Sequence, residues 1–468
     1  MYKIKIKFKT IISTMSQVST GDEKDAHSWM TLLSNYVMTK KEKTDKLESE
    51  KETTSMFLSD LSQNKSQENT EQSLPKFFYK IPSNPSQMHL KMRTEAKQKF
   101  LSLKASQTPE KTDLKNLLIL LKNNISPPND GTERINYNDF NKVKNKVPLF
   151  SDYFTACNFL KFDKDKYGRI EILAFFHYVV RRNNIEENKI NLSFFGFCGE
   201  GYLLEKDLEF YIWREMQNFS FISTIEQNKQ DLYVLHCLRK FCFFLDQKNK
   251  GKINIDDIVT SSILSEFLEM TGPTYQTLTK AELASNWFSK ETFERVCKKY
   301  ILLNTKRNHL LSKQELVKYS PGLTNIFIDR IFEEYQTYEN AFTYKEFLDF
   351  VLAMEYKKSK ASIQYIWRAI DVYHKNAVDT FIINMFFRAI AKKLELRNKG
   401  EYKIDDVKDE IWDMIKPKNK NYFTLQDVLS SPYGDVVLSL LIDAKAFYYH
   451  DQKEYMIIDE FTDMDEEY

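Results

Sequence analysis

The stretch DKDKYGRIEILA, residues 163–174, decides the fold. It has aspartates at its first and third positions, a glycine at its sixth and an isoleucine at its eighth. This is the frame of an EF-hand loop, in which the acids offer oxygen ligands and the glycine allows a sharp turn. Hydrophobic residues at 159–160 and 175–176 flank the stretch, as amphipathic helices would. The stretch therefore predicts a helix–loop–helix unit.

The same frame recurs along the chain in eight candidate loops. They start at Pro128, Asp163, Gly196, Asp246, Asn304, Tyr335, Asp371 and Lys416. Every eighth position is hydrophobic, a residue that lets two loops pair through a short strand: Ile135, Ile170, Leu203, Ile253, Leu311, Phe342, Val378 and Phe423. At the sixth position, seven loops have Gly, Asn or His, the types that tolerate positive φ, and the remaining loop has Glu133. The seven are Gly168, Gly201, Gly251, His309, Asn340, Asn376 and Asn421. We therefore predict a mostly α fold, with tandem paired EF-hand-like helix–loop–helix units in an elongated array and short loop-pairing strands.

Composition agrees with this fold and suggests where the regions divide. The 468 residues include only 11 Gly and 11 Pro, which favours long helices, and 42% are hydrophobic, enough for a large core. Residues 40–74 are polar and charged, whereas aromatic content rises from Pro75. We predict a mobile N-terminal arm at 1–74, EF-hand-like helical regions at 75–190, 191–300 and 301–450, and an acidic tail at 451–468.

Charge and motifs exclude several classes of function. The 68 basic and 66 acidic residues nearly cancel, so we expect neither a nucleic-acid nor a membrane partner. The five cysteines form no CxxC pair, and no apolar stretch is long enough to cross a membrane. The sequence contains no phosphate-binding loop, nucleophile elbow or zinc-protease motif. We therefore expect no catalytic residue, no enzyme activity and a cytoplasmic protein.

The loops keep the frame of a calcium site but not its ligands. Calcium needs about six to eight oxygens, including a bidentate carboxylate at position 12. The Asp163 loop has Ala174 at that position, and Lys306 puts an ammonium at the third position of the Asn304 loop. The weak candidate ligands are Asp163, Asp165, Asp246, Asp257, Asn304, Asn308, Ser312 and Glu315. We expect no bound metal and no cofactor.

Short runs spread over residues 75–450 resemble the B″ regulatory subunits of protein phosphatase 2A, and in particular the gamma-type branch that includes the plant Tonneau proteins. The runs are PKFFYKIP at 75–82, YGRI at 167–170, GYL at 201–203, RKFCFFLD at 239–246, GKI at 251–253, NWFS at 286–289, LSKQEL at 311–316, NIFIDRIF at 325–332, LDFVLA at 348–353, DDVKDEI at 405–411 and KP at 416–417. The four-residue run NWFS is specific to the family.

This resemblance implies a noncatalytic subunit that binds the HEAT-repeat scaffold and the catalytic subunit of the phosphatase, and so selects substrate and location. In relatives that bind calcium, the loops matching those at Asn304 and Asp371 hold it, and both depart from the pattern here. The Tonneau-like branch implies a place at microtubule-organising structures, such as the centrosome, basal body or cilium, with microtubule-associated or axonemal partners. Two other functions stay open: a cytoskeletal adaptor without phosphatase, and a calcium sensor, against which the lost ligands count.

One aromatic cluster lies between two prolines near the predicted arm. Phe77, Phe78 and Tyr79 are too few to form a core, and the prolines favour an extended backbone. These rings either pack on the chain's own first helices or, as we prefer because of the resemblance, contact the scaffold subunit.

Overall fold

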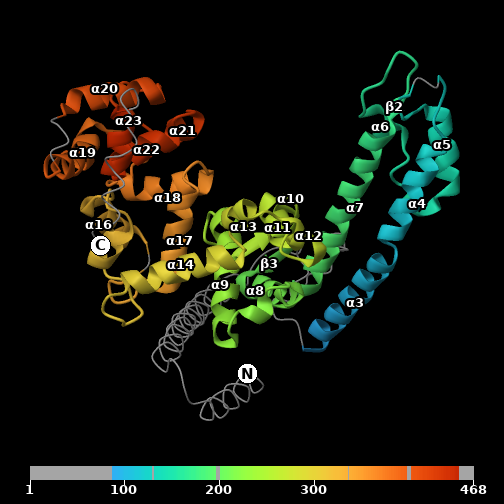
Figure 1. Cartoon of the computed structure of the whole chain (residues 1–468), viewed down its shortest axis with the longest axis horizontal. Coiled ribbons are helices and arrows are strands. Elements are labelled where there is room, and N and C mark those ends of the chain that lie inside the picture. Colours follow the sequence, from blue (N-terminus) through green and yellow to red (C-terminus); the bar gives the residue numbers. More distant parts are fainter. Residues whose placement is uncertain (1–86, 129–130, 197–200, 336, 398–401, 453–468) are drawn as a thin grey trace, which may run out of the picture. The chain divides into compact units, whose positions relative to one another are not determined.

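A computed structural model describes residues 87–128, 131–196, 201–335, 337–397 and 402–452 (Figure 1). The predicted arm at 1–74, and the tail beyond residue 452, lie outside the described residues. These two boundaries therefore stay predictions.

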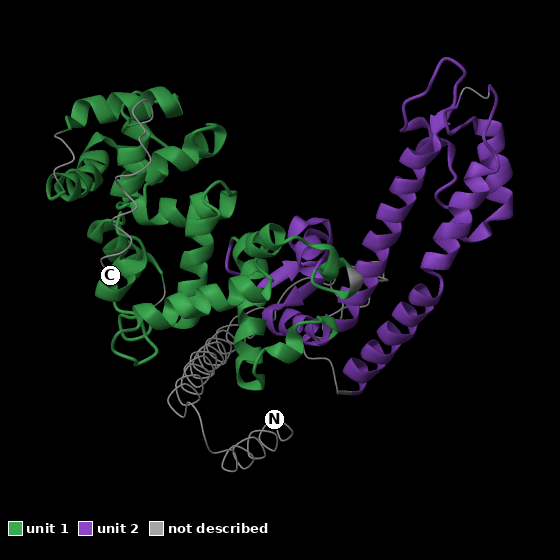
Figure 2. Ribbon diagram, in the orientation of Figure 1, with its two compact units in different colours: residues 1–69, 218–247, 270–468 green, residues 70–217, 248–269 purple. Residues whose placement is uncertain are grey.

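The chain is divided into two compact units, each assembled from separate stretches of sequence (Figure 2). The described part of unit 2 comprises residues 87–217 and 248–269, and that of unit 1 comprises residues 218–247 and 270–452. Each of the three regions predicted at 75–190, 191–300 and 301–450 contains at least one complete pair of loops, but their boundaries remain a prediction.

The described part of unit 2 begins with a long helix and contains four short strands. Its helices and strands are α3 (Gln87–Ser106), α4 (Lys111–Lys122), β1 (Arg134–Ile135), α5 (Tyr137–Lys146), α6 (Ala156–Leu160), β2 (Ile170–Glu171), α7 (Ile172–Phe195), β3 (Tyr202–Leu204), α8 (Glu205–Glu215), β4 (Lys252–Asn254), α10 (Ile255–Thr260) and α11 (Ser262–Leu268), with a 3-10 turn at Pro148–Phe150.

The described part of unit 1 contains two short strands. Its helices and strands are α9 (Gln230–Leu245), α12 (Gly272–Thr277), α13 (Lys280–Ser285), α14 (Lys290–Leu303), α15 (Lys313–Leu316), α16 (Asn325–Glu334), α17 (Tyr344–Glu355), α18 (Lys360–Ile370), β5 (Val378–Asp379), α19 (Thr380–Glu395), α20 (Ile404–Ile415), β6 (Tyr422–Phe423), α21 (Leu425–Ser430), α22 (Gly434–Ile442) and α23 (Ala444–Asp451), with 3-10 turns at Ile222–Thr224, Gln227–Lys229 and Val317–Tyr319.

The eight predicted loops meet in four antiparallel pairs, and in every pair the two eighth residues are direct partners. The registers are Ile135 with Ile170, Leu203 with Ile253, Leu311 with Phe342, and Val378 with Phe423. All eight of these side chains are buried, which explains why each must be hydrophobic. The predicted fold of paired EF-hand-like units with short loop-pairing strands is confirmed.

Backbone geometry at the sixth position follows the sequence in six of the seven loops that carry Gly, Asn or His there. Positive φ occurs there at Gly168, Gly201, Gly251, His309, Asn340 and Asn376. The expectation is wrong for Asn421, whose backbone N–H instead donates to Asn419 Oδ1 at 2.8 Å, while Lys416 takes the left-handed conformation. In the first loop, Gly131 has positive φ in place of Glu133. The turn therefore needs a left-handed residue without fixing it at position 6.

Aromatic side chains fill the core around the first loop pair. Phe140 of α5 lies 4.6 Å from Phe154 and 4.9 Å from Phe175 of α7, measured between ring centroids. Phe159 packs edge-on against Phe140 at 5.1 Å. These buried rings join the helices on either side of both loops, so packing of the flanking helices holds the loops in place.

Candidate ion-binding loops and the family-signature core

Arg169, at the seventh position of the Asp163 loop, is fully buried although the three residues before it, 166–168, are exposed. Its Nε donates to Asp165 Oδ2 at 2.8 Å. Its Nη1 crosses to the partner loop, where it donates to the carbonyl oxygens of Ser126 at 2.9 Å and Pro128 at 2.7 Å. One guanidinium thus gathers a carboxylate and two carbonyls from both loops of the pair, the oxygen types that calcium selects.

The carboxylate of Asp165 is occupied in the same way. Its Oδ1 accepts the backbone N–H groups of Tyr167 at 3.0 Å and Arg169 at 2.9 Å. Asp163, the other acid of this loop, is exposed. A divalent cation placed here would meet the fixed positive charge of Arg169 and a carboxylate that already accepts three hydrogen bonds. The structure therefore explains the missing acid at position 12 of this loop. The guanidinium of Arg169 donates hydrogen bonds to the oxygens that would otherwise face an ion.

The partner loop, which starts at Pro128, ends in an acid, Asp139, whose oxygens accept hydrogen bonds from neighbouring side chains. Asp139 accepts the Ser126 hydroxyl at 2.6 Å and the Lys142 ammonium at 2.7 Å. The Lys142 hydrogen bond, followed by that of Ser126, lowers the pKa of the Asp139 carboxyl below its ordinary 3.8. Asn136 caps the same helix by accepting the backbone N–H of Asp139 at 2.8 Å. This carboxylate therefore serves the start of α5.

In the Asn304 loop, a buried carboxylate accepts the hydrogen bonds of the polar groups inside the loop. Glu315, at position 12, is 3% exposed, and each of its carboxylate oxygens accepts two hydrogen bonds. Oε1 accepts from the Thr305 hydroxyl and the Lys306 N–H, and Oε2 from the hydroxyl and N–H of Ser312. Burial raises the pKa of Glu315, but the hydrogen bonds from Ser312, Thr305 and Lys306 outweigh it and bring the pKa below the ordinary 4.5.

Six of the eight loops carry an acid at position 12, and the sequence reasoning missed four of them. The six are Asp139, Asp207, Asp257, Glu315, Glu346 and Asp427, of which Asp139, Asp207, Glu346 and Asp427 were not recognised. In the third and fourth pairs they close capping boxes: Glu346 with Thr343, and Asp427 with Thr424. The pattern Thr-x-x-acid before an apolar helix could have revealed them. A position-12 acid therefore has a structural reason to be present without any ion.

The remaining candidate ligands do not assemble into a site. Asp371, the first residue of the seventh loop and not one of those candidates, is buried, and its two oxygens accept the backbone N–H groups of Lys375 at 3.1 Å and Asn376 at 2.7 Å. Asp257 is exposed in the first turn of α10, and Asp246 caps the end of α9. Asn308 Oδ1 accepts the Leu310 N–H, which again closes the loop on itself.

Calcium, which the family resemblance implies, does not suit these residues. Asn304 Oδ1 is a buried oxygen without a hydrogen-bond partner, yet Glu315 opposite it in the frame is saturated and the third position is Lys306. Among the described residues, no three His, Cys, Asp or Glu side chains are grouped so as to hold a metal ion.

The runs RKFCFFLD, NWFS and LDFVLA, distant in sequence, meet in the core of unit 1. Arg239 of α9 forms a bidentate ion pair with Asp349 of α17, with both N–O distances at 2.8 Å. Lys240 donates to the Tyr356 hydroxyl at 2.9 Å and lies 4.5 Å from the centre of that ring. These pairs tie α9 to α17 at the edge of an otherwise apolar contact.

His236 and Trp287 lock α9 to the entry of α14. Their rings stack at 4.3 Å with an angle of 3° between planes. Trp287 Nε1 donates to the His236 carbonyl at 3.0 Å, and His236 Nε2 donates back to the Trp287 carbonyl at 2.9 Å. Burial lowers the pKa of His236 to about 3, so the ring is neutral at physiological pH. The run NWFS thus has a structural role: its Trp287 holds the start of α14 against α9.

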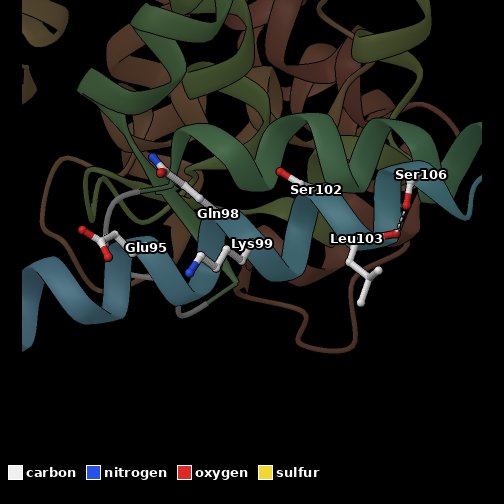
Figure 3. Close-up of a pocket in the computed structure, with 6 residues that line it drawn as sticks. All are labelled: Glu95, Gln98, Lys99, Ser102, Leu103 and Ser106. Carbon is white, nitrogen blue, oxygen red and sulfur yellow. Dashed lines mark hydrogen bonds between the residues drawn. The ribbon is translucent and has the colours of Figure 1, made fainter.

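The surface hollow on α3 is shallow and is lined by that helix alone (Figure 3). Its lining residues are Glu95, Gln98, Lys99, Ser102, Leu103 and Ser106. Since no second element contributes a side chain, the hollow offers a face of a helix and not an enclosed cavity for a small ligand. The predicted contact residues Phe77, Phe78 and Tyr79 lie outside the described residues.

Comparison with known proteins decides the family. The B″ gamma regulatory subunit of serine/threonine-protein phosphatase 2A from Xenopus tropicalis is 39% identical over 390 residues, which cover 82% of this chain and 86% of that protein. The chain belongs to the B″ gamma family of phosphatase 2A regulatory subunits. The human B″ gamma subunit is 38% identical over 82% of this chain and 85% of its own length. The probable B″ subunit TON2 of Arabidopsis thaliana is 31% identical over 82% of this chain and 83% of its own length.

Family membership confirms the predicted resemblance, and it makes the chain a regulatory subunit and not a catalytic one. No family model matches the chain. A chain in a solved structure described as a PP2A PR70 holoenzyme aligns with a TM-score of 0.46 and 19% identity, over 53% of this chain and 92% of that one. Across the described residues, no helix combines the length and the apolar character needed to span a membrane.

Proposed function

We propose that this B″ gamma-type chain binds the HEAT-repeat scaffold and the catalytic subunit of protein phosphatase 2A and recruits them to substrates. The observation that carries this proposal is the identity of 38–39% to B″ gamma subunits over about four fifths of the chain. Its mechanism is recruitment: binding energy to phosphatase and substrate raises the effective concentration of one beside the other.

The aromatic cluster of Phe77, Phe78 and Tyr79 is our proposed contact with the scaffold subunit. Aromatic side chains are enriched among the residues that dominate binding energy, and replacing Phe77 and Phe78 with Ala is expected to cost roughly 2–4 kcal/mol. About 1.4 kcal/mol is a factor of ten in affinity, so scaffold binding should weaken at least tenfold.

The test is a binding titration of the full chain and of the double variant Phe77→Ala with Phe78→Ala against purified scaffold subunit. A matched control replaces Phe210 and Trp213, two exposed aromatic residues of α8, with Ala. We expect the first variant to melt normally and bind weakly, and the control to bind normally. Early melting with normal binding would show that the cluster packs on the chain itself.

We further propose that the protein acts at microtubule-organising or ciliary structures, with microtubule-associated or axonemal partners. This part rests only on the resemblance to the Tonneau-like branch. Imaging of the tagged full chain beside a basal-body marker tests it, and a uniform cytoplasmic signal would refute it.

Affinity purification of the full chain from native cells separates the phosphatase subunit from an adaptor without phosphatase. Scaffold and catalytic chains should co-purify with it. If cytoskeletal proteins co-purify in their absence, the adaptor function replaces the one proposed.

A further inference from the structure

Exposed apolar side chains gather beside the first loop pair of unit 2, where α5, α6 and β2 lie together at the start of α7 (Figure 1). Leu160, the last residue of α6, is 65% exposed, and Tyr167 of the loop that follows is 52% exposed. Tyr137, the first residue of α5, is 41% exposed, and its ring packs edge-on at 5.2 Å against the buried ring of Phe159. A group of exposed apolar side chains, unlike a single one, indicates an interaction surface.

Lysines lie directly beside these rings. The Lys164 ammonium is 5.9 Å from the centre of the Phe159 ring, and the Lys166 ammonium is 5.0 Å from the centre of the Tyr167 ring. Among the residues that the structure describes, neither lysine pairs with a carboxylate. Both ammonium groups are therefore available to an anionic ligand whose apolar groups contact the neighbouring rings.

The acids of the same loop leave positive charge in excess. Asp165 is paired with the buried Arg169 at 2.8 Å, so its charge is already compensated. Lys161 is exposed and donates to an uncharged group, the Asn158 Oδ1, at 2.9 Å. The stretch 160–167 therefore presents three lysines against one exposed carboxylate, that of Asp163. This excess argues against a second copy of the same surface as the occupant, since the two would repel each other.

The surface rests on a packed core that fixes its shape. The Phe159 ring, which contacts both Tyr137 and Lys164, lies 5.1 Å from the buried Phe140 ring. The backbone N–H of Tyr167 donates to Asp165 Oδ1 at 3.0 Å, which holds the loop closed. A surface that is already ordered loses little conformational entropy when it binds.

We propose that this surface binds an acidic segment of the protein substrates, one with aromatic or aliphatic residues among its acids. We call it the basic aromatic surface, and it consists of Tyr137, Leu160, Lys161, Lys164, Lys166 and Tyr167. Apolar groups of the segment would cover the exposed rings and Leu160, while its carboxylates pair with the lysines. Half of the surface is apolar, and three lysines offer few phosphate contacts, so it suits a protein segment better than a nucleic acid. That the segment belongs to a substrate rests on the proposed function.

A fluorescence titration of the full chain tests the surface itself. The probe is a fluorescein-labelled peptide in which Asp and Glu alternate with Phe and Leu. We expect Lys164→Glu with Lys166→Glu to weaken binding about tenfold or more. The matched control is Lys418→Glu with Lys420→Glu, two exposed lysines with the same spacing in the Lys416 loop, and it should leave binding unchanged. Equal loss in both variants, or no binding to the unaltered chain, would refute the proposal.

The apolar half of the surface is tested in the same titration. Leu160→Ser should weaken binding severalfold, whereas Leu396→Ser, a change at an exposed leucine at the end of α19, should not. All of these side chains are exposed, so each variant should melt as the unaltered chain does. A peptide with Ser in place of Phe and Leu should bind about tenfold more weakly, and equal binding would overturn the apolar contact. Tighter binding of a single-stranded RNA, lost in the Lys164 and Lys166 variant, would show a nucleic-acid surface instead.

Two further measurements separate this proposal from the proposed function. Purified scaffold subunit should bind the Lys164→Glu with Lys166→Glu variant as tightly as the unaltered chain. Weaker scaffold binding in this variant would make the surface a scaffold contact and overturn the proposal. If the unaltered chain itself fails to bind scaffold, the proposed function is refuted, and the peptide titration still decides whether the surface binds acidic segments.

The role in substrate selection is measured with the reconstituted phosphatase complex. Its substrate is a phosphopeptide joined to the acidic segment of the probe. With the Lys164→Glu and Lys166→Glu variant in the complex, KM should rise about tenfold while kcat is unchanged, because recruitment adds binding without changing the chemical step. The same phosphopeptide without the segment should show no difference between the two complexes. An unchanged KM for the segment-bearing phosphopeptide would refute the role in substrate selection.

Discussion

The first and third loop pairs have the same frame but fill their interiors with opposite charges. In the first pair, the guanidinium of Arg169 reaches from one loop to the carbonyls of the other. In the third pair, the carboxylate of Glu315 accepts four hydrogen bonds from its own loop. Both side chains form hydrogen bonds with backbone groups inside a pair of loops whose eighth residues are partners in a short antiparallel pairing. The fold therefore requires that the polar groups inside the loops be satisfied, and it does not require a calcium ion to do so.

The largest effect is expected at the first pair. Arg169→Ala leaves the carbonyl oxygens of Ser126 and Pro128 without this donor, and each unsatisfied buried group costs about 1–2 kcal/mol. We expect a loss of roughly 2–4 kcal/mol, measured by hydrogen exchange at the backbone amides of Ile135 and Ile170, which report the pairing of these two loops. Lys166→Ala, an exposed change in the same loop, is the control and should cost less than about 0.5 kcal/mol. If the two variants behave alike, Arg169 does not hold the pair together.

A smaller effect is expected at the third pair, and it should depend on pH. Glu315→Ala removes the acceptor of four hydrogen bonds and the acid of a capping box, and should cost about 1–3 kcal/mol near neutral pH. Because folding lowers the pKa of Glu315, its contribution is complete above its ordinary pKa of 4.5 and is lost as the pH falls through the lower folded value. Denaturant titrations of the unaltered chain and of Glu315→Ala should therefore give free energies of unfolding that converge as the pH falls from neutral to acid. Gln314→Ala, an exposed neighbour, serves as the control, and a difference that grows in acid would contradict this account.

No effect is expected from calcium on either pair. A ligand at about 100 times its dissociation constant stabilises a protein by roughly 2.7 kcal/mol, a shift of several degrees. Since the carboxylates of Asp139, Asp165 and Glu315 already accept hydrogen bonds from the chain itself, millimolar calcium should leave the melting curve of the full chain where it is in chelator. A clear rise of the melting temperature in calcium would contradict this expectation. Asp163 and Asp165, the acids of the one loop with acids at positions 1 and 3, would then be replaced first.

The sequence reasoning succeeded where the pattern is local. A twelve-residue spacing with a hydrophobic eighth residue located all eight loops, because the short strand between loops leaves no room for a polar side chain there. It failed at Asn421, whose backbone N–H donates to the side chain two residues earlier, while positive φ in this loop occurs at Lys416. It also read the position-12 residues only as calcium ligands, although the same spacing is that of a capping box.

Sequence alone determined the helix–loop–helix units, their number and the B″ family, since each depends on residue types at fixed short spacings. Only the tertiary structure decided what replaces the ion and what the family runs do. Arg169 looks like one more charged loop residue until the partner loop, 41 positions away, brings the Pro128 carbonyl to it. Arg239 and Asp349 are 110 positions apart and become an ion pair only because α9 packs against α17. A contact between distant residues depends on how the helices pack, and no local spacing encodes it.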